Sequence, residues 1–322
     1  MMNLTLPQQR ERYLASGDDR ELPIIDAHMH LWDPRQNYHP WLCDEPMIPF
    51  RYGDYAAIRR PFLPHHYRAL TGEHKVYGVV YMEAEWDPRD PLGEIAWLHH
   101  LAEETRWPNA VIGQAWLDRE DIDHLLAQLS SSPLVRGVRH KPAALPRADY
   151  YPGHQLKGSM NCPIWQQGYQ KLAQHHLLFE LQTPWWHLPD AASLLTRFPD
   201  VKMVINHAGL PGDRDPQTLA GWHDALRQLA AIPDVTIKIS GLGLPSRSWC
   251  IEDNQQLIRQ TIELFGPERC MFASNFPVDS LVTRLDALFD ALKAITADYS
   301  PPDRLKMFCD NAARIYRLDT KL

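Results

Sequence analysis

The chain of 322 residues has few cysteines, no cluster of basic residues and no long apolar segment. Its five cysteines, Cys43, Cys162, Cys250, Cys270 and Cys309, are scattered and never form a Cys-x-x-Cys pair. This pattern argues against a disulfide framework and favours reduced thiols in a cytoplasmic protein. The net charge is −7 and no run of Lys and Arg is present, which argues against a nucleic-acid partner because phosphate binding needs clustered basic residues.

Two further absences narrow the class of protein. No stretch is apolar over a length that would span a bilayer, and Met1 to Leu22 lacks the apolar core of a signal peptide. No Gly-x-Gly-x-x-Gly follows any apolar run, which makes an open nucleotide-binding sheet the weaker alternative for the fold. We therefore expect a small-molecule substrate and no membrane partner.

The chain does contain eight short apolar or β-branched runs, with helical periodicity between most of them. The predicted strands are Leu22–His28, Val76–Glu83, Ala110–Trp116, Leu134–His140, Leu177–Gln182, Val201–His207, Val235–Ser240 and Arg269–Ser274. The predicted helices are Pro91–Arg106, Asp118–Leu129, Leu188–Phe198, Gln217–Ala230, Glu252–Phe265 and Leu281–Ala297. Alternating strands and helices indicate a parallel sheet, and eight such units indicate a (β/α)8 TIM-like barrel of the α/β class.

We expect one domain. Residues 1–21 are predicted to form an N-terminal extension, and residues 22–322 the barrel. Long segments follow strands one and four, the Pro- and aromatic-rich Trp32–Pro64 and residues 141–162. Loops at the carboxyl ends of barrel strands commonly wall the active site, so these two segments are expected to do so.

The most informative motif is His28-Met29-His30 at the end of the first predicted strand. Alternate residues of a strand point to the same face, so Asp26, His28 and His30 are expected on one side. Two imidazoles side by side can bind a cation or polarise a carbonyl group. A lone His-x-His is weak as a signal, and its weight here comes from what recurs downstream.

Polar side chains stand at the ends of most other predicted strands. They are Glu83, Arg139, His140, Trp185, His187, His207, Lys238, Asn275 and Asp279. Each alone has an ordinary explanation, such as a salt bridge for Glu83 or Lys238 and packing for Trp185. Histidines at the ends of strands one, four and six are harder to explain by packing, because buried polar groups cost several kcal/mol unless they are satisfied. Their convergence is therefore expected to form a site.

Five segments together resemble the amidohydrolase superfamily. They are Ile25-Asp26-Ala27-His28-Met29-His30-Leu31-Trp32-Asp33-Pro34, Val135-Arg136-Gly137-Val138-Arg139-His140, Ile205-Asn206-His207-Ala208-Gly209, Lys238-Ile239-Ser240-Gly241-Leu242 and Met271-Phe272-Ala273-Ser274-Asn275-Phe276-Pro277-Val278. Within the superfamily the chain is similar to the branch of metal-independent or weakly metal-dependent lactonases. That branch includes 2-pyrone-4,6-dicarboxylate lactonase and sugar lactonases such as L-fuconolactonase.

The resemblance implies a catalytic role for His28, His30 and His207. It also implies that Arg139 and His140 bind the substrate or stabilise an oxyanion. One departure matters: the family usually has an aspartate at the position of Asn275, and that carboxylate takes a proton from the attacking water. An amide cannot act as a base near neutral pH.

The missing carboxylate leaves the general base open. Asp279 is the first substitute because it lies just beyond Asn275 on the same loop. Glu83 and His207 are the other candidates. Asn275 therefore has three interpretations: another group is the base, the chemistry needs no base at this position, or the protein has lost hydrolysis.

The leading hypothesis is a hydrolase that opens a lactone of a sugar acid or of a small carboxylated ring, in carbohydrate or aromatic catabolism. Water attacks the ring carbonyl, and His28, His30 and Arg139, aided by Lys238, donate to the developing oxyanion. The residues expected to bind substrate are Glu83, His140, His187, Lys238, Trp32 and Trp185.

A cofactor is not required for this chemistry, because lactones are activated esters. One divalent metal such as Zn²⁺ at His28, His30 and His207 is the alternative. The competing functions are a metal-dependent decarboxylase of an aromatic acid and a non-catalytic small-molecule binder. Homo-oligomerisation is open.

Overall fold

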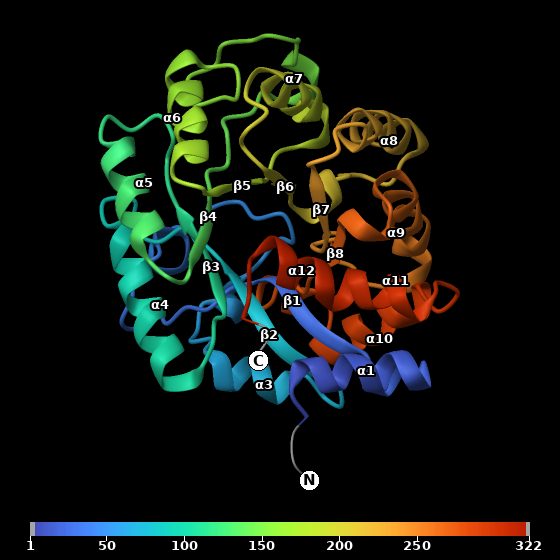
Figure 1. Cartoon of the computed structure of the whole chain (residues 1–322). Helices are drawn as coiled ribbons and strands as arrows, with labels where there is room; N and C mark the ends of the chain where they lie inside the picture. Colours follow the sequence, from blue (N-terminus) through green and yellow to red (C-terminus); the bar gives the residue numbers. More distant parts are fainter. Residues whose placement is uncertain (1–3, 320–322) are drawn as a thin grey trace.

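The computed structural model describes residues 4–319, which form eight parallel strands ringed by helices (Figure 1). Each strand pairs with the next in chain order, from β1 to β8. The strands are β1 (Pro23–Met29), β2 (Lys75–Met82), β3 (Ala110–Gln114), β4 (Val135–Arg139), β5 (Leu178–Leu181), β6 (Met203–Ile205), β7 (Thr236–Ile239) and β8 (Cys270–Phe272). The eight predicted strands and the (β/α)8 barrel are confirmed.

Most helices pack on the outer face of the strands, and the short helix α2 (Pro40–Cys43) lies instead in the long segment after β1. The helices are α1 (Leu6–Ser16), α2 (Pro40–Cys43), α3 (Pro64–Leu70), α4 (Pro91–Thr105), α5 (Ile122–Ser131), α6 (Pro163–Gln174), α7 (Leu188–Arg197), α8 (Pro216–Ala230), α9 (Ile251–Phe265), α10 (Leu285–Ile295), α11 (Pro301–Leu305) and α12 (Asn311–Ile315). Many begin with proline, whose fixed φ suits the first helical turn and whose missing N–H has no partner there. This placement accounts for much of the high proline content.

Helix α6 was not predicted from the sequence. It begins at Pro163 and buries Trp165, Tyr169 and Leu172, but polar residues and a glycine lie between them. Gly168 is required by packing: a Cβ there would lie 1.9 Å from the carbonyl oxygen of Leu117. The spacing of Trp165, Tyr169 and Leu172, i, i+4 and i+7, is helical, so the sequence carried a local signal for this helix. Its position is set by the contact of Gly168 with the preceding βα unit.

Residues 4–21 of the predicted N-terminal extension pack against the outside of the barrel. Helix α1 lies beside α11, and its Tyr13 is fully buried. Arg10 forms an ion pair of 2.8 Å with Asp310, and Tyr77 on β2 donates a hydrogen bond to the Leu4 carbonyl. Among the described residues no helix has the length and apolar character needed to cross a membrane.

The barrel closes between β1 and the segment that follows β8. The Asn275 N–H donates to the His28 carbonyl at 2.8 Å, and the His30 N–H donates to the Phe276 carbonyl at 2.7 Å. Asp26 reinforces this junction, because its buried carboxylate accepts hydrogen bonds from the Ser274 backbone and hydroxyl. The same bonds fix the carboxyl end of β1 relative to that of β8.

We expect Asp26→Ala to lower the free energy of unfolding by about 3 kcal/mol, because the substitution leaves the buried Ser274 N–H and Tyr67 hydroxyl without an acceptor. Urea denaturation followed by circular dichroism measures the change. Asp234→Ala, at an exposed position, is the matched control and is expected to change stability by less than about 0.5 kcal/mol. Equal effects of the two substitutions would contradict the role of Asp26.

Candidate active site

The three motif histidines come together at the carboxyl end of the barrel. The ring centroid of His28 lies 5.1 Å from that of His30 and 4.6 Å from that of His207. All three side chains are buried. Burial, reinforced by neighbouring cationic and imidazole groups, lowers the pKa of His28 and of His207 well below the ordinary value. The rings are therefore neutral at physiological pH.

His30 is held by the backbone of β2. Its Nδ1 lies 2.9 Å from the Met82 carbonyl oxygen, and a carbonyl only accepts, so Nδ1 carries the proton. Burial lowers the pKa of His30 to about 3. In the neutral ring Nε2 is then an acceptor, and it lies 3.3 Å from the side-chain amide of Asn275.

The Asn275 amide connects His30 to Asp279. The other end of the amide lies 2.6 Å from Asp279 Oδ1, which also accepts a hydrogen bond from Tyr52. An ionised Asp279 accepts from the amide N–H and leaves the amide oxygen facing His30. A protonated Asp279 donates to the amide oxygen, and the amide N–H then donates to His30 Nε2.

The pKa of Asp279 is raised toward neutral pH, so both the protonated and the ionised form of its carboxyl group matter for this contact. Burial raises its pKa to about 6, although Arg51 and the hydrogen bonds from Asn275 and Tyr52 act in the opposite direction. Asp279 is not among the residues that line the main cavities described below. Its predicted role as general base stays untested, and the structure places it behind Asn275.

His207 is set at the end of β6 by an unusual backbone. His207 and Ala208 both have left-handed φ angles, near 50°, a conformation that costs non-glycine residues energy and clusters at functional sites. His207 Nδ1 lies 2.9 Å from Ser240 Oγ. Gly241 is required beside it, since a Cβ there would lie 2.5 Å from His207 Nδ1 and 2.8 Å from Arg51 Nη2.

Arg139 is buried and nearly saturated with hydrogen bonds. Its Nε and Nη2 donate to the side chain and the backbone carbonyl of Glu83, and its Nη1 donates to Gln182. Burial alone would raise the pKa of Glu83, but Arg139 and Lys141 outweigh it and lower that pKa. Glu83 is therefore an anion that positions Arg139.

A second buried ion pair lies inside the barrel. Lys238 Nζ on β7 lies 3.0 Å from Glu180 Oε2 on β5, and the Tyr316 hydroxyl donates to the other oxygen of Glu180. Burial lowers the pKa of Lys238 to about 8, while Glu180 opposes the shift. Lys238 does not line either main cavity. Its predicted contact with substrate stays untested, and its observed partner is Glu180.

Two adjoining cavities open at this end of the barrel. The inner cavity, of about 250 Å³, is bounded by His30, His207 and Asn275, together with Trp32, Phe50 and Arg51. The outer cavity has about 560 Å³. Trp41, Ile48, Glu85, Arg139 and Lys141 line both.

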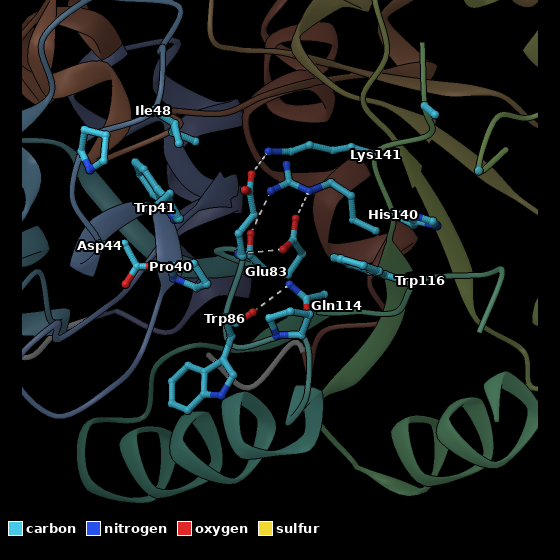
Figure 2. Close-up of a pocket in the computed structure, with 16 residues that line it drawn as sticks. Pro40, Trp41, Asp44, Ile48, Glu83, Trp86, Gln114, Trp116, His140 and Lys141 are labelled. Atoms are coloured by element: carbon cyan, nitrogen blue, oxygen red, sulfur yellow. Dashed lines mark hydrogen bonds and ion pairs between the residues drawn. The ribbon is translucent and has the colours of Figure 1, made fainter. Parts of the chain in front are cut away.

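The outer cavity is mostly apolar. Figure 2 shows Trp41 and Trp116 on opposite sides of it, with Glu83 between them and Trp86 below. Trp116 is 46% exposed and stacks parallel to the His140 ring. Exposed aromatic surface of this kind is typical of a ligand-binding wall.

His140 offers a fixed donor to the outer cavity. Its Nδ1 accepts hydrogen bonds of 3.0 Å from the Leu117 N–H and the Trp165 indole N–H. Burial lowers the pKa of His140 to about 4. The neutral ring therefore carries its proton on Nε2.

The cavities include most of the predicted site residues, with His30, Trp32, Arg139, His207 and Asn275 lining the inner one and Glu83 and His140 the outer one. His28, Trp185 and His187 line neither cavity. Trp185 packs on Gly221 and under Arg147, and His187 faces Asp190.

Several cavity residues were not among the predicted set. They are Trp41, Phe50, Glu85, Trp86, Gln114, Trp116, Lys141 and Gln182. All lie at strand ends or on the segments after strands one to five. Their position after a strand was the available signal, and their chemistry alone was too ordinary to single them out.

His28, His30 and His207 are the candidate ligands of a divalent cation in the barrel. Both ring nitrogens of His28 are buried without a hydrogen-bond partner, which is the situation of a ligand awaiting an ion. Among the described residues, however, the three ligand atoms that lie within 4.8 Å of one another belong to His154, His187 and Asp190. The three barrel histidines do not form such a group. As arranged, the barrel set does not fit the ion, and metal binding there stays a prediction.

Comparisons with known proteins identify the family. The family model described as Amidohydrolase matches residues 25–318. An uncharacterized protein named y4mH from Sinorhizobium fredii is 35% identical over 303 residues, covering 92% of this chain and 99% of its own length. The chain therefore belongs to the amidohydrolase family and is a hydrolase.

Two further relatives carry more specific descriptions. L-fucono-1,5-lactonase from Burkholderia multivorans is 28% identical over 312 residues, covering 91% of this chain and 96% of its own. A crystal structure of an amidohydrolase from Burkholderia multivorans with bound zinc aligns with a TM-score of 0.74 at 25% identity, covering 92% of this chain and 99% of that one. The amidohydrolase resemblance inferred from the sequence is confirmed.

The raised pKa of Asp279 predicts a pH-dependent stability. Its pKa is about 6 in the folded chain and 3.8 ordinarily, so its contribution to stability is fully present below about pH 4 and is lost as pH rises to about 6. Asp279→Asn lacks this titration. We expect the free energy of unfolding of the variant, relative to the wild type, to rise between about pH 4 and pH 6 and to stay constant above about pH 7.

Urea unfolding of both proteins across this range measures the difference, in which the contributions of other carboxylates cancel. Asp234→Asn is the control. A difference between wild type and Asp279→Asn that is flat across the range would show that Asp279 does not titrate there.

Proposed function

We propose that this chain hydrolyses a lactone by attack of water on the ring carbonyl within the inner cavity. The observation that carries the proposal is the meeting of neutral His30 and His207 with Arg51 and Arg139 in one cavity at the carboxyl end of the barrel. The lactonase relatives of similar length support the reaction class. The ring oxygen of a lactone leaves as an alcohol that stays tethered, so no protonated amine has to be expelled.

His207 is the general base of the proposed mechanism. When its Nδ1–H donates to Ser240 Oγ, the Nε2 lone pair is free to accept a proton from water. Its ring belongs to the lining of the inner cavity. Glu83 is held by Arg139 and Asp279 lies behind Asn275, so neither faces the reacting water as directly.

Cationic donors stabilise the oxyanion that forms on the lactone carbonyl. Arg139 is fixed by Glu83 and Gln182, so it needs little rearrangement as charge develops. Arg51 has only long contacts, 3.4 Å to the Gly241 carbonyl and 3.5 Å to Asp279. It is therefore the donor with unused N–H groups, and it suits the oxyanion or a substrate carboxylate.

The outer cavity indicates the substrate class. A sugar lactone would occupy the inner cavity, whereas the outer space of about 560 Å³ lined by Trp41, Trp86 and Trp116 suits an apolar or aromatic substituent. We propose a lactone that carries such a substituent next to its polar ring. His140 Nε2–H and Lys141 supply donors where the two parts would join.

A panel of lactones tests the reaction. Each ring opening releases a carboxylic acid, and its proton is followed with a pH indicator. We expect turnover of at least one lactone, and His207→Ala should lower kcat at least about 100-fold because a general base contributes roughly 10²–10⁴ in rate. His124→Ala, at an exposed position of α5, is the matched control and should retain wild-type kcat.

Assays with the lactones and with aromatic acids separate the competing functions. Thermal stabilisation by lactones without any proton release would favour a binding protein. Release of CO₂ from aromatic acids by a metal-loaded preparation would favour a decarboxylase. Wild-type kcat in His207→Ala would remove His207 from the mechanism and leave the reaction class standing.

Trp116→Ala tests the substrate class. Removing the indole takes apolar contact from the outer cavity, so we expect KM for an aryl-substituted lactone to rise about 5- to 30-fold, corresponding to roughly 1–2 kcal/mol. KM for an unsubstituted sugar lactone should stay unchanged. Leu14→Ala on α1, which is equally exposed at 46%, is the control. Equal effects on both lactones would contradict occupancy of the outer cavity.

A further inference from the structure

A second cluster of ligand-type side chains lies outside both cavities. His154 comes from the long segment after β4, His187 from the single helical turn η4 (Trp185–His187) after β5, and Asp190 from the first turn of α7. All three are buried, at 2%, 1% and 5% exposure. Three polar side chains from separate segments therefore meet in the interior without lining a cavity described above.

Three atoms of the cluster face one common point. His154 Nε2 lies 3.3 Å from His187 Nδ1 and 3.6 Å from Asp190 Oδ2, and His187 Nδ1 lies 3.0 Å from Asp190 Oδ2. Ligands about 2.0–2.1 Å from a tetrahedral Zn²⁺ stand about 3.3–3.4 Å apart. The mean spacing of the cluster has this value, so one ion would reach all three atoms with small adjustments.

The groups behind these atoms suit a metal-bound state. Leu145 presents both backbone groups to His187 Nε2, its N–H at 3.0 Å and its carbonyl oxygen at 3.2 Å. A histidine that binds a metal through Nδ1 carries its proton on Nε2 and donates it to the carbonyl oxygen, whereas an ion-free ring with its proton on Nδ1 accepts from the N–H. The Tyr150 hydroxyl donates to Asp190 Oδ1 at 3.3 Å, which leaves Oδ2 for the ion. Two imidazoles and one carboxylate are a common zinc donor set.

The burial pattern of the loop gives a second, independent observation. From residue 146 to residue 157 every side chain is exposed except half-buried Tyr150 and buried His154. The loop is held in part by Arg147, which lies over the Trp185 ring and donates to Thr218, and by the hydrogen bond from the Tyr150 hydroxyl to Asp190. A coordinate bond at His154 would add to these anchors.

We propose that His154, His187 and Asp190 bind a divalent cation of the Zn²⁺ class that fastens the loop after β4 to η4 and α7. The same loop contributes Ala143 and Gly158 to the outer cavity. The ion thus holds one wall of that cavity and takes no part in the chemistry. The inference does not depend on lactone hydrolysis, because it concerns a different set of side chains and a structural role.

The alternative is a cluster held by hydrogen bonds alone. Without an ion the two imidazoles turn their inner N–H groups toward Asp190 Oδ2 and toward each other, 3.3 Å apart. Such an arrangement satisfies the carboxylate, whose oxygen can accept two donors, and the Leu145 N–H then donates to His187 Nε2 at 3.0 Å. Metal content distinguishes the alternatives directly.

The experiment measures zinc by mass spectrometry in the full-length protein after chelation, reloading with Zn²⁺ and removal of free ion. We expect wild type and His28→Ala to retain zinc at the cluster and His154→Ala to have one equivalent less than wild type. His124→Ala, on the exposed face of α5, should match wild type. Limited proteolysis should cleave within residues 146–157 at least about tenfold faster in chelated than in loaded wild type, with no such difference in His154→Ala.

Absorption of Co²⁺-loaded wild type and His154→Gln provides a measurement that does not rely on the alanine variant folding. Four-coordinate bands in wild type that are lost in His154→Gln would support the site. Equal zinc content in folded wild type and His154→Ala would overturn it. Loss of all zinc in His28→Ala, or no zinc bound more tightly than roughly micromolar by wild type, would overturn it as well.

Discussion

The hydrogen-bonded junction between β1 and the segment after β8 is the constraint on which the site depends. Asp26 binds the backbone of Ser274, and the next residues along both segments exchange backbone hydrogen bonds through His28, Asn275 and His30. The His-x-His motif and the residue that departs from the family pattern are therefore held in register by the bonds that close the barrel. Fold and site are determined by the same few atoms.

The sequence predicted the strands and the barrel because most strands are short apolar or β-branched runs that are buried in the fold, which is a local signal. It also led to the inner cavity, since His30, His207 and Asn275 follow strands directly. Helix α6 was not predicted although its buried residues have helical spacing, and its position is set by the approach of Gly168 to Leu117. That contact is between distant residues and leaves no periodic pattern.

The roles of several side chains were predicted poorly, because their burial and their partners in space cannot be read from the sequence. His187 and Lys238 look like site residues in the sequence, yet they face Asp190 and Glu180. Arg51 and Trp116 bound the cavities from loops, and loop residues have no fixed relation to a strand end. The identity of a residue's partner in space was the missing information, and it comes only from the folded chain.

The short contact between Asn275 and Asp279 has a consequence for substitution at position 275. With an aspartate at 275, two carboxylates would stand where an amide now lies 2.6 Å from a carboxylate. Like charges at that separation do not both ionise, so such a pair would share one proton or need a cation between them. Placing an aspartate at 275 is therefore not a neutral exchange in this chain, because Asp279 lies in contact with that position.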